Sequence, residues 1–220
     1  MISSTVSERI EKIFYTLLNY FGPQNWWPAE TRYEVIVGSI LTQNTSWKNV
    51  EKAIKNLKEK GLLDIEKISE IDLKDLYELI KPSGFYKQKA ERLKNISKRI
   101  LIDFGNVENM MRYDLDYLYK YLISLKGIGD ETAESILLYA LDKKIFVVDS
   151  YTIRIFQRLG LPSNREEIKN QVMNTLKELD NLKEFHALLV ELGKRYCKKI
   201  PKCDGCPLND SCLFRKGVER

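Results

Sequence analysis

The four cysteines of the chain stand close together near its C-terminal end, in the stretch YCKKIPKCDGCPLNDSC, as Cys197, Cys203, Cys206 and Cys212. Their spacing, C-x5-C-x2-C-x5-C, allows four thiolates to converge on one metal centre. Zinc sites usually take two C-x2-C pairs from separate turns. A single such pair flanked by longer arms is more typical of a loop that wraps a cubane cluster. We therefore expect a [4Fe–4S] cluster, with zinc or no metal as the alternatives. The loop also carries three lysines that are expected to face DNA phosphates: Lys198, Lys199 and Lys202.

A glycine-rich turn provides the second chemical feature, at Lys126, Gly127, Ile128 and Gly129. Two glycines permit positive φ and leave backbone N–H groups accessible at a helix start, where the helix dipole also favours an anion. With a helix on either side, this turn could grip one phosphate of a DNA backbone. The alternative is an ordinary connector, and the acidic pair that follows, Asp130 and Glu131, is favourable in the first turn of any helix.

Asp149 is the third feature, because it ends the apolar run IFVV twenty residues after the glycine turn. The simplest interpretation is the N-cap of the following helix, SYTIRIFQRLG. A carboxylate held by a buried run could also stabilise an oxocarbenium ion or activate water at a sugar C1′, as carboxylates do in glycoside hydrolysis.

The elements that must position these residues are nearly all helical. Apolar periodicity and turn signals predict an all-α protein, in which IFVV is the one β-like piece and is too short to build a sheet. The expected helices are 4–21, 30–43, 46–59, 64–69, 72–81, 87–103, 114–124, 130–141, 150–159, 164–178 and 181–195.

Composition narrows the class of protein. The 220 residues are 44% hydrophobic, which suits one domain or two small domains, and the formal net charge is +5. Residues 195–220 carry seven basic and three acidic side chains, so most of the positive charge lies beside the cysteines. A basic segment fits a polyanionic partner. The N-terminus lacks a signal-peptide core and no apolar run could span a membrane, so we expect a cytoplasmic, nucleoid-associated protein with no membrane partner.

The order and spacing of these features resemble the endonuclease III family of DNA base-excision glycosylases, within the helix-hairpin-helix superfamily. The resemblance runs from about residue 10 to 212. LTQNTSWKNVEKA (41–53) is similar to the family's LSxQxT segment and SGFYKQKAERL (83–93) to its GLYNxKA segment. LKGIGDETA (125–133) is similar to LPGVGRKTA and VVDSYTIRI (147–155) to AVDTHIFRV. The first two cysteines are five residues apart, whereas most members have six.

The resemblance implies a two-domain, all-helical fold. A six-helix barrel domain with the helix-hairpin-helix would span 30–141, and residues 1–29 and 142–220 would pair as the iron–sulfur cluster domain. The partner would be double-stranded DNA with a damaged base flipped into the enzyme, which is expected to act as a monomer. Asp149 takes the catalytic role. Asn44 is similar to the side chain that fills the vacated stack and Phe85 to the wedge in the opposite strand, and the adjacent Gln43 and Tyr86 are the alternatives for these two roles.

One departure from the family pattern concerns the chemistry. Bifunctional members carry a lysine in GVGRKTA that attacks C1′ and forms a Schiff base, and this chain has Glu131 there. A carboxylate cannot form the imine, so the sequence predicts a monofunctional glycosylase. A bifunctional glycosylase/lyase for oxidised pyrimidines is the alternative and would need another amine, such as Lys126. A non-catalytic iron–sulfur DNA-binding protein is the alternative of another class.

The tryptophans indicate which base is removed. Trp26, Trp27 and Trp47 all lie near the expected base pocket, together with Glu131, and Lys194 lies just before the cysteines. Aromatic faces attract electron-poor, cationic bases, on the order of 1–2 kcal/mol each when desolvated. We therefore expect an N-alkylated purine such as 3-methyladenine. WWP, LTQNT and KGIGxE also resemble the 3-methyladenine glycosylase branch, which usually lacks the iron–sulfur loop. Core packing for the tryptophans and a solvated helix-end lysine are the alternatives.

Overall fold

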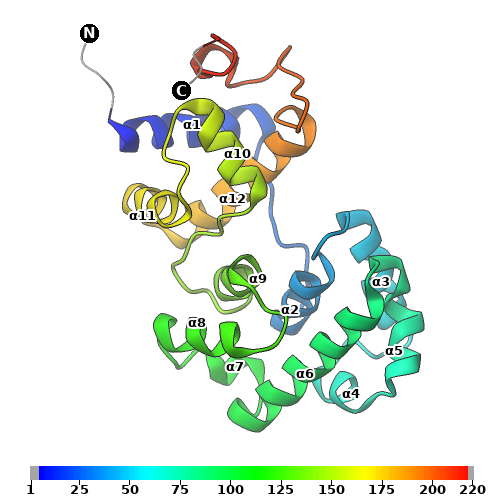
Figure 1. Ribbon diagram of the computed structural model, residues 1–220. Helices are drawn as coiled ribbons and strands as arrows, with labels where there is room; N and C mark the ends of the chain where they lie inside the picture. The colour runs from blue at the N-terminus through cyan, green and yellow to red at the C-terminus, as the bar shows by residue number, and fades with distance from the viewer. Residues whose placement is uncertain (1–4, 218–220) are drawn as a thin grey trace. The chain divides into compact units, whose positions relative to one another are not determined.

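A computed structural model describes residues 5–217 (Figure 1). Across these residues every regular element is helical and no strand occurs, which confirms the expected all-α class. The chain forms two compact units, one from Trp27 to Lys143 and the other from the residues before and after that segment. The assignment of these units as a barrel domain and a cluster domain stays a prediction.

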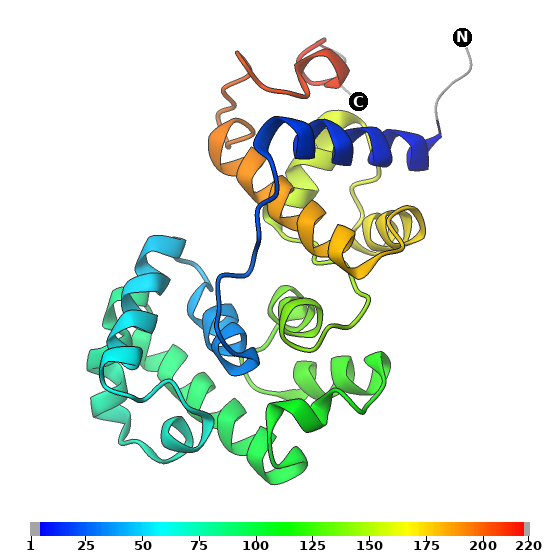
Figure 2. The ribbon, with the colours of Figure 1, turned by 180° about the vertical axis from the view of Figure 1, so that it is seen from behind.

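The terminal unit contains α1 (Val6–Phe21), α10 (Ser150–Leu159), α11 (Arg165–Thr175), α12 (Leu179–Arg195) and the short 3-10 helix η3 (Asn209–Ser211). Figures 1 and 2 show α1 lying along α11 and α12. Three fully buried rings, Phe146, Phe156 and Phe185, meet at the centre of this unit. Phe146 precedes α10 in the chain, so the same core that joins the helices also fixes the approach to Asp149.

The middle unit packs its helices on α2 and α6. Its elements are α2 (Arg32–Leu41), α3 (Trp47–Glu59), α4 (Ile65–Glu70), α5 (Leu73–Ile80), η1 (Lys81–Ser83), α6 (Tyr86–Phe104), α7 (Val107–Met110), α8 (Leu115–Ser124), α9 (Asp130–Ser135) and the π-helical η2 (Ile136–Ala140). Side-chain N-caps begin α2, α4, α5, α7 and α8; the Thr31 hydroxyl, for example, accepts from the N–H of Glu34 at the start of α2.

The described elements differ most from the expected helices at α7 and at η2. The four-residue α7 follows Gly105, whose φ is +81°, and is capped by Asn106; it is too short to carry an apolar period. The helix expected over 130–141 is α-helical only to Ser135 and continues as the buried π-helix η2. Residue 4 of the first expected helix, and Glu219 and Arg220 of the basic tail, lie outside the described residues.

No helix within residues 5–217 is long and apolar enough to cross a membrane.

Candidate active site and metal centre

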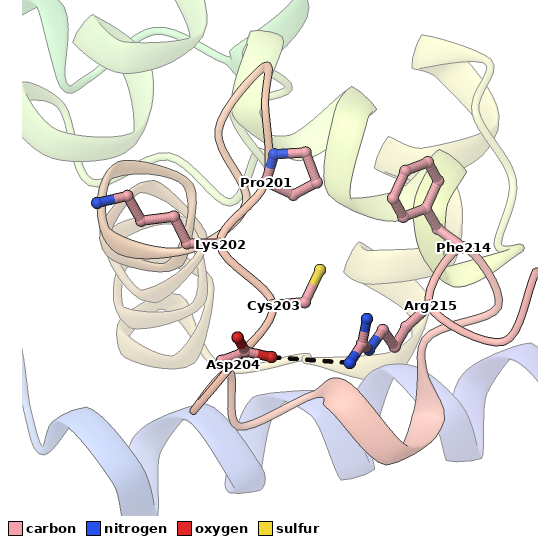
Figure 3. Close-up of a pocket in the computed structure, with 6 residues that line it drawn as sticks. All are labelled: Pro201, Lys202, Cys203, Asp204, Phe214 and Arg215. Atoms are coloured by element: carbon pink, nitrogen blue, oxygen red, sulfur yellow. Dashed lines mark ion pairs between the residues drawn. The ribbon is translucent and has the colours of Figure 1, made fainter.

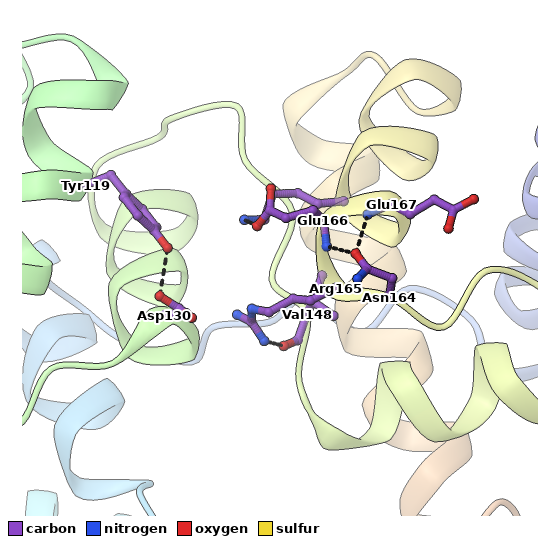
Figure 4. Close-up of polar contacts among 8 residues, drawn as sticks. Tyr119, Asp130, Val148, Asn164, Arg165, Glu166 and Glu167 are labelled. Carbon is purple, nitrogen blue, oxygen red and sulfur yellow. Dashed lines mark hydrogen bonds and ion pairs between the residues drawn. The ribbon is translucent and has the colours of Figure 1, made fainter.

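Asp149 begins α10 as its N-cap. Its Oδ1 accepts the backbone N–H of Thr152 at 2.7 Å, and its backbone is extended, with φ −94° and ψ 179°. The four preceding residues, 145–148, are all buried, and the Arg165 guanidinium donates to the Val148 carbonyl directly before the aspartate (Figure 4). A buried extended segment therefore delivers one carboxylate to a helix N-terminus, where negative charge is favoured. The capping role that the sequence offered as the simpler interpretation is present.

The second carboxylate oxygen of Asp149 faces a histidine that sequence reasoning missed. His186 Nε2, on α12, lies 3.9 Å from Asp149 Oδ2, and both residues are buried. Burial lowers the pKa of His186; the Asp149 charge opposes this shift and Lys194 adds to it. The imidazole is therefore neutral at pH 7 beside the carboxylate. His186 is the one histidine of the chain, and that rarity was the signal available from the sequence.

The hairpin turn connects α8 to α9. Gly127 has φ +85°, which an L side chain adopts only with strain, and Ile128 inserts into the core while Lys126, Gly127 and Gly129 are exposed. Across the turn, the Tyr119 hydroxyl donates to Asp130 Oδ1 at 2.8 Å (Figure 4). The buried side chain of Ile128 thus anchors a loop whose glycines are exposed. Asp130, the first of the two acidic residues after the turn, links α9 to α8 through its hydrogen bond with Tyr119.

Two further loops of the middle unit carry the side chains expected to enter DNA. Asn44 is exposed with φ +54°, and Phe85 is 64% exposed with φ +46°. Their neighbours are engaged within the protein: Gln43 donates to Thr132 Oγ1 at 2.9 Å, and the ring of Tyr86 packs edge-on against Tyr77. This pattern fits the assignment of Asn44 and Phe85 as inserting residues, which stays a prediction.

The tryptophans divide between the two units. Trp27 packs edge-on against Trp47 and tilted against Tyr139 of η2, each with ring centroids 5.4 Å apart. Gly38 makes this packing possible, because a Cβ there would lie 3.0 Å from the Trp27 indole. Trp26 belongs to the terminal unit, where the Lys194 ammonium lies 5.7 Å from its ring centroid. Lys194 and Glu131 are both exposed.

All four cysteines line one small cavity of about 30 Å³ in the loop after α12. The pKa of the Cys206 thiol is raised by burial and by the charges of the other three cysteines. The guanidinium of Arg158 donates to Cys197 Sγ at 3.2 Å and to the Lys198 carbonyl, so α10 holds the first arm of the loop.

The metal centre expected at these cysteines stays a prediction. Within residues 5–217 no three His, Cys, Asp or Glu side chains are grouped closely enough to hold one metal ion. The four thiols that line one hollow match in number the four thiolates that a [4Fe–4S] cluster takes. Asp204 and Arg215 form an ion pair in a second hollow, which Cys203 also lines (Figure 3). Three exposed lysines flank the cysteines: Lys198, Lys199 and Lys202.

Comparison with known proteins identifies the class. The model of the HhH-GPD superfamily of base excision DNA repair proteins matches residues 37–181, and the chain belongs to this family. It is 54% identical over 214 residues to a putative DNA repair glycosylase of Methanocaldococcus jannaschii, covering 94% of this chain and 97% of the relative.

Two other relatives differ from each other in activity. Endonuclease III of Thermotoga maritima is 35% identical over 187 residues, covering 83% of each chain. The 3-methyladenine DNA glycosylase of H. pylori, solved with bound 1,N6-ethenoadenine, has a TM-score of 0.75 and 32% identity and covers 87% of this chain and 98% of its own. The chain is therefore a base excision repair DNA glycosylase with the helix-hairpin-helix fold, which confirms the family expected from the sequence.

Proposed function

We propose that the chain is a monofunctional DNA glycosylase that hydrolyses the N-glycosidic bond of an N-alkylated purine such as 3-methyladenine. The observation that carries this proposal is Glu131, which stands in the first turn of α9 where bifunctional relatives have the lysine nucleophile. Without that amine, water rather than an enzyme nitrogen attacks C1′ and the DNA strand is left intact.

Asp149 supplies the negative charge in this mechanism. Capping occupies Oδ1, and in this mechanism Oδ2, the oxygen beside His186, acts on the sugar. As the C1′–N bond lengthens, the carboxylate stabilises the oxocarbenium ion and orients the attacking water. The neutral His186 beside it does not compensate the charge of Asp149, so the carboxylate acts at full charge.

An alkylated purine is supported by the aromatic residues and by one relative. Trp27, Trp47 and Tyr139 form an aromatic cluster, and Trp26 already attracts one cation, Lys194. Such rings favour a cationic base, and the positive charge of 3-methyladenine also makes it a good leaving group. The H. pylori glycosylase, at 32% identity, is a 3-methyladenine enzyme.

The remaining parts of the proposal concern DNA and the cofactor. The hairpin residues 126–129 grip a phosphate, Asn44 and Phe85 enter the duplex, and the lysines beside the cysteines contact the backbone of double-stranded DNA. Cys197, Cys203, Cys206 and Cys212 hold a [4Fe–4S] cluster. The cluster would fix the shape of the basic loop, and no step at the sugar passes through it. The enzyme acts as a monomer.

A bifunctional glycosylase/lyase for oxidised pyrimidines is the second candidate. It is favoured by the 35% identity to an endonuclease III, and the exposed amine of Lys126 beside the hairpin would serve as its nucleophile. A DNA-binding iron–sulfur protein without catalysis is the candidate of another class.

One assay separates these functions. Single-turnover reactions use duplexes with one lesion each: 3-methyladenine or a stable analogue, hypoxanthine, thymine glycol, 8-oxoguanine or uracil. Each product is read with and without hot alkali. Breaks at the alkylated purine only after alkali support the proposal. Breaks at thymine glycol without alkali, together with covalent trapping by borohydride, contradict it, and no product on any duplex favours the non-catalytic protein.

A further inference from the structure

The loop between Cys197 and Cys203 carries an exposed apolar tip. Its five residues, 198–202, read KKIPK. Ile200, in the middle, is 87% exposed and is the most exposed large hydrophobic side chain among the described residues. Isolated apolar side chains are common on protein surfaces, so exposure alone assigns no role to it. Ile200 is distinguished by the way in which the loop holds it.

Hydrogen bonds close the base of this loop. The Tyr196 carbonyl accepts the backbone N–H groups of both Lys198 and Lys202, each at 2.9 Å. The chain therefore leaves and returns at the same carbonyl oxygen, and residues 199–201 form the tip of a closed loop.

A guanidinium of α10 fixes the first side of the tip. Arg158 donates to the Lys198 carbonyl at 2.7 Å and to the Lys199 carbonyl at 2.9 Å. The guanidinium carbon lies 5.0 Å from the ring centroid of Phe214, so an aromatic face supports it from the other end of the cysteine segment. One rigid, planar group thus holds the two carbonyls that directly precede Ile200.

The tip residues also restrict their own conformations. Proline has a fixed φ, and the residue before a proline is confined to extended backbone, so Ile200 has little backbone freedom beside Pro201. Its β-branched side chain is stiff at χ1 as well. The loop therefore presents an apolar side chain to solvent in a nearly fixed orientation, and little conformational entropy is lost when a partner covers it.

The charges around Ile200 indicate an anionic partner. Three exposed lysines surround it in the loop, and residues 198–202 contain no acid. A duplex offers both phosphates for the lysines and deoxyribose C–H groups for the isoleucine. The minor groove of B-DNA is about 6 Å wide, so one side chain can fill it, whereas the major groove, about 12 Å wide, takes a helix or a β-ribbon. Isoleucine is among the apolar side chains that enter the minor groove in DNA-binding proteins.

We propose that Ile200 is an apolar contact to the minor groove of double-stranded DNA, seated against deoxyribose edges while the lysines around it contact phosphates. The inference rests on the proposed DNA contact of these lysines and adds a contact that charge does not provide. Salt screens the lysines but not a hydrophobic contact, so Ile200 preserves affinity as the ionic strength rises. The minor groove also carries little sequence information, which suits a glycosylase that meets lesions in any sequence.

The test measures affinity for a duplex with one tetrahydrofuran abasic analogue at several salt concentrations. Ile200→Ser is expected to weaken binding about 5- to 30-fold, the range for uncovering part of an isoleucine side chain, without changing the slope of log Kd against log salt. Ile200→Val keeps most of the apolar surface and is expected to bind within about 4-fold of the parent. Lys199→Gln is expected to reduce the slope by about one unit. Ile102→Ser, at an isoleucine of α6 that is 73% exposed, is the matched control and is expected to bind like the parent.

Hydroxyl-radical cleavage of the bound duplex locates the contact. These radicals abstract deoxyribose hydrogens that line the minor groove, so an isoleucine seated there protects the neighbouring sugars. At saturating protein, Ile200→Ser is expected to lose protection at those sugars and to keep the rest of the parent footprint. Unchanged protection in Ile200→Ser, or a reduced salt slope for this variant, would overturn the proposal. Because Ile200 is exposed, the variant is expected to melt like the parent; a lower melting temperature with unchanged affinity would show a structural role instead.

Failure of the proposed lysine contacts gives a different result. If Lys199→Gln leaves the affinity and the slope unchanged, the loop does not contact phosphates, and the Ile200 contact fails with it. If Lys199→Gln behaves as expected and Ile200→Ser binds like the parent, only the Ile200 contact is wrong. If the two proteins bind DNA equally and only the parent binds vesicles that contain phosphatidylglycerol, the tip fits a lipid surface, and the proposal is also wrong.

Discussion

Replacing Asp149 by asparagine separates the capping role that the structure shows from the catalytic role that we propose for the same side chain. Asparagine caps helices about as well as aspartate, so the hydrogen bond from the Thr152 N–H is expected to remain. The negative charge is lost. Asp149→Asn is therefore expected to keep its stability and lose most of its glycosylase rate.

The expected loss of rate can be calculated from the loss of the negative charge of Asp149. A carboxylate about 4 Å from a developing cation, in a site of effective dielectric constant about 20, contributes about 4 kcal/mol. Each 1.4 kcal/mol is about tenfold in rate, so the rate falls about 1,000-fold. Because Asp149 is only 6% exposed, solvent screens this interaction less than it would at the surface.

The assay is a single-turnover rate on the lesion duplex that the parent enzyme processes, together with thermal unfolding. Asp149→Ala is the matched variant: it loses charge and cap, so it is expected to match the asparagine variant in rate but to melt about 2–4 °C lower. If Asp149→Asn retains more than about a tenth of the parent rate, the carboxylate does not carry the chemistry. If both variants melt alike, the cap adds no stability.

Four other predictions follow from the site. Cys203→Ser is expected to lower the bound iron and the visible absorbance of the purified protein, and unchanged iron content would exclude this thiol as a ligand. Glu131→Lys is expected to create a species that borohydride traps on lesion DNA; failure to trap would mean that residue 131 does not reach C1′. Gly127→Ala is expected to destabilise the protein by about 1–2 kcal/mol because of its positive φ, and further because Arg92 must move, as a denaturant titration measures. Because the pKa of His186 is lowered in the folded chain, the unfolded chain binds more protons than the folded chain below about pH 6.5. The free energy of unfolding therefore falls as the pH falls through that range. His186→Asn is expected to make the melting temperature less dependent on pH.

Local sequence signals predicted the helices because caps and turns are short-range. Gly105, Gly127 and Gly160 all adopt positive φ, and each lies at a helix end or in a turn. Apolar periodicity did not identify α7, because four residues cover little more than one turn. It also did not distinguish α-helix from π-helix in η2, where every residue is buried and the apolar pattern is continuous.

The candidate site was less accessible to sequence reasoning because its contacts are long-range. The motifs located Asp149 and the hairpin, yet the bond from Arg92 to Gln43 spans 49 positions and that from Gln43 to Gly127 spans 84. Nothing in LTQNT indicates which of Gln43 and Asn44 turns inward. That choice depends on the donors and acceptors that α6 and the hairpin bring to the loop.

Capping and catalysis at Asp149 were alternatives in the sequence; the structure shows the cap, and the cap would support the catalytic role that we propose. A carboxylate has two oxygens, and the cap uses only Oδ1. The Thr152 N–H fixes the rotation of the side chain, and the α10 dipole favours its negative charge, so Oδ2 needs no reorganisation when positive charge develops at the sugar. His186 lies on the side of Oδ2 and is kept neutral by burial. A protonated histidine there would pair with the carboxylate and weaken its attraction for the oxocarbenium ion. In the proposed mechanism, the same burial that costs stability in acid therefore protects the charge that the reaction uses.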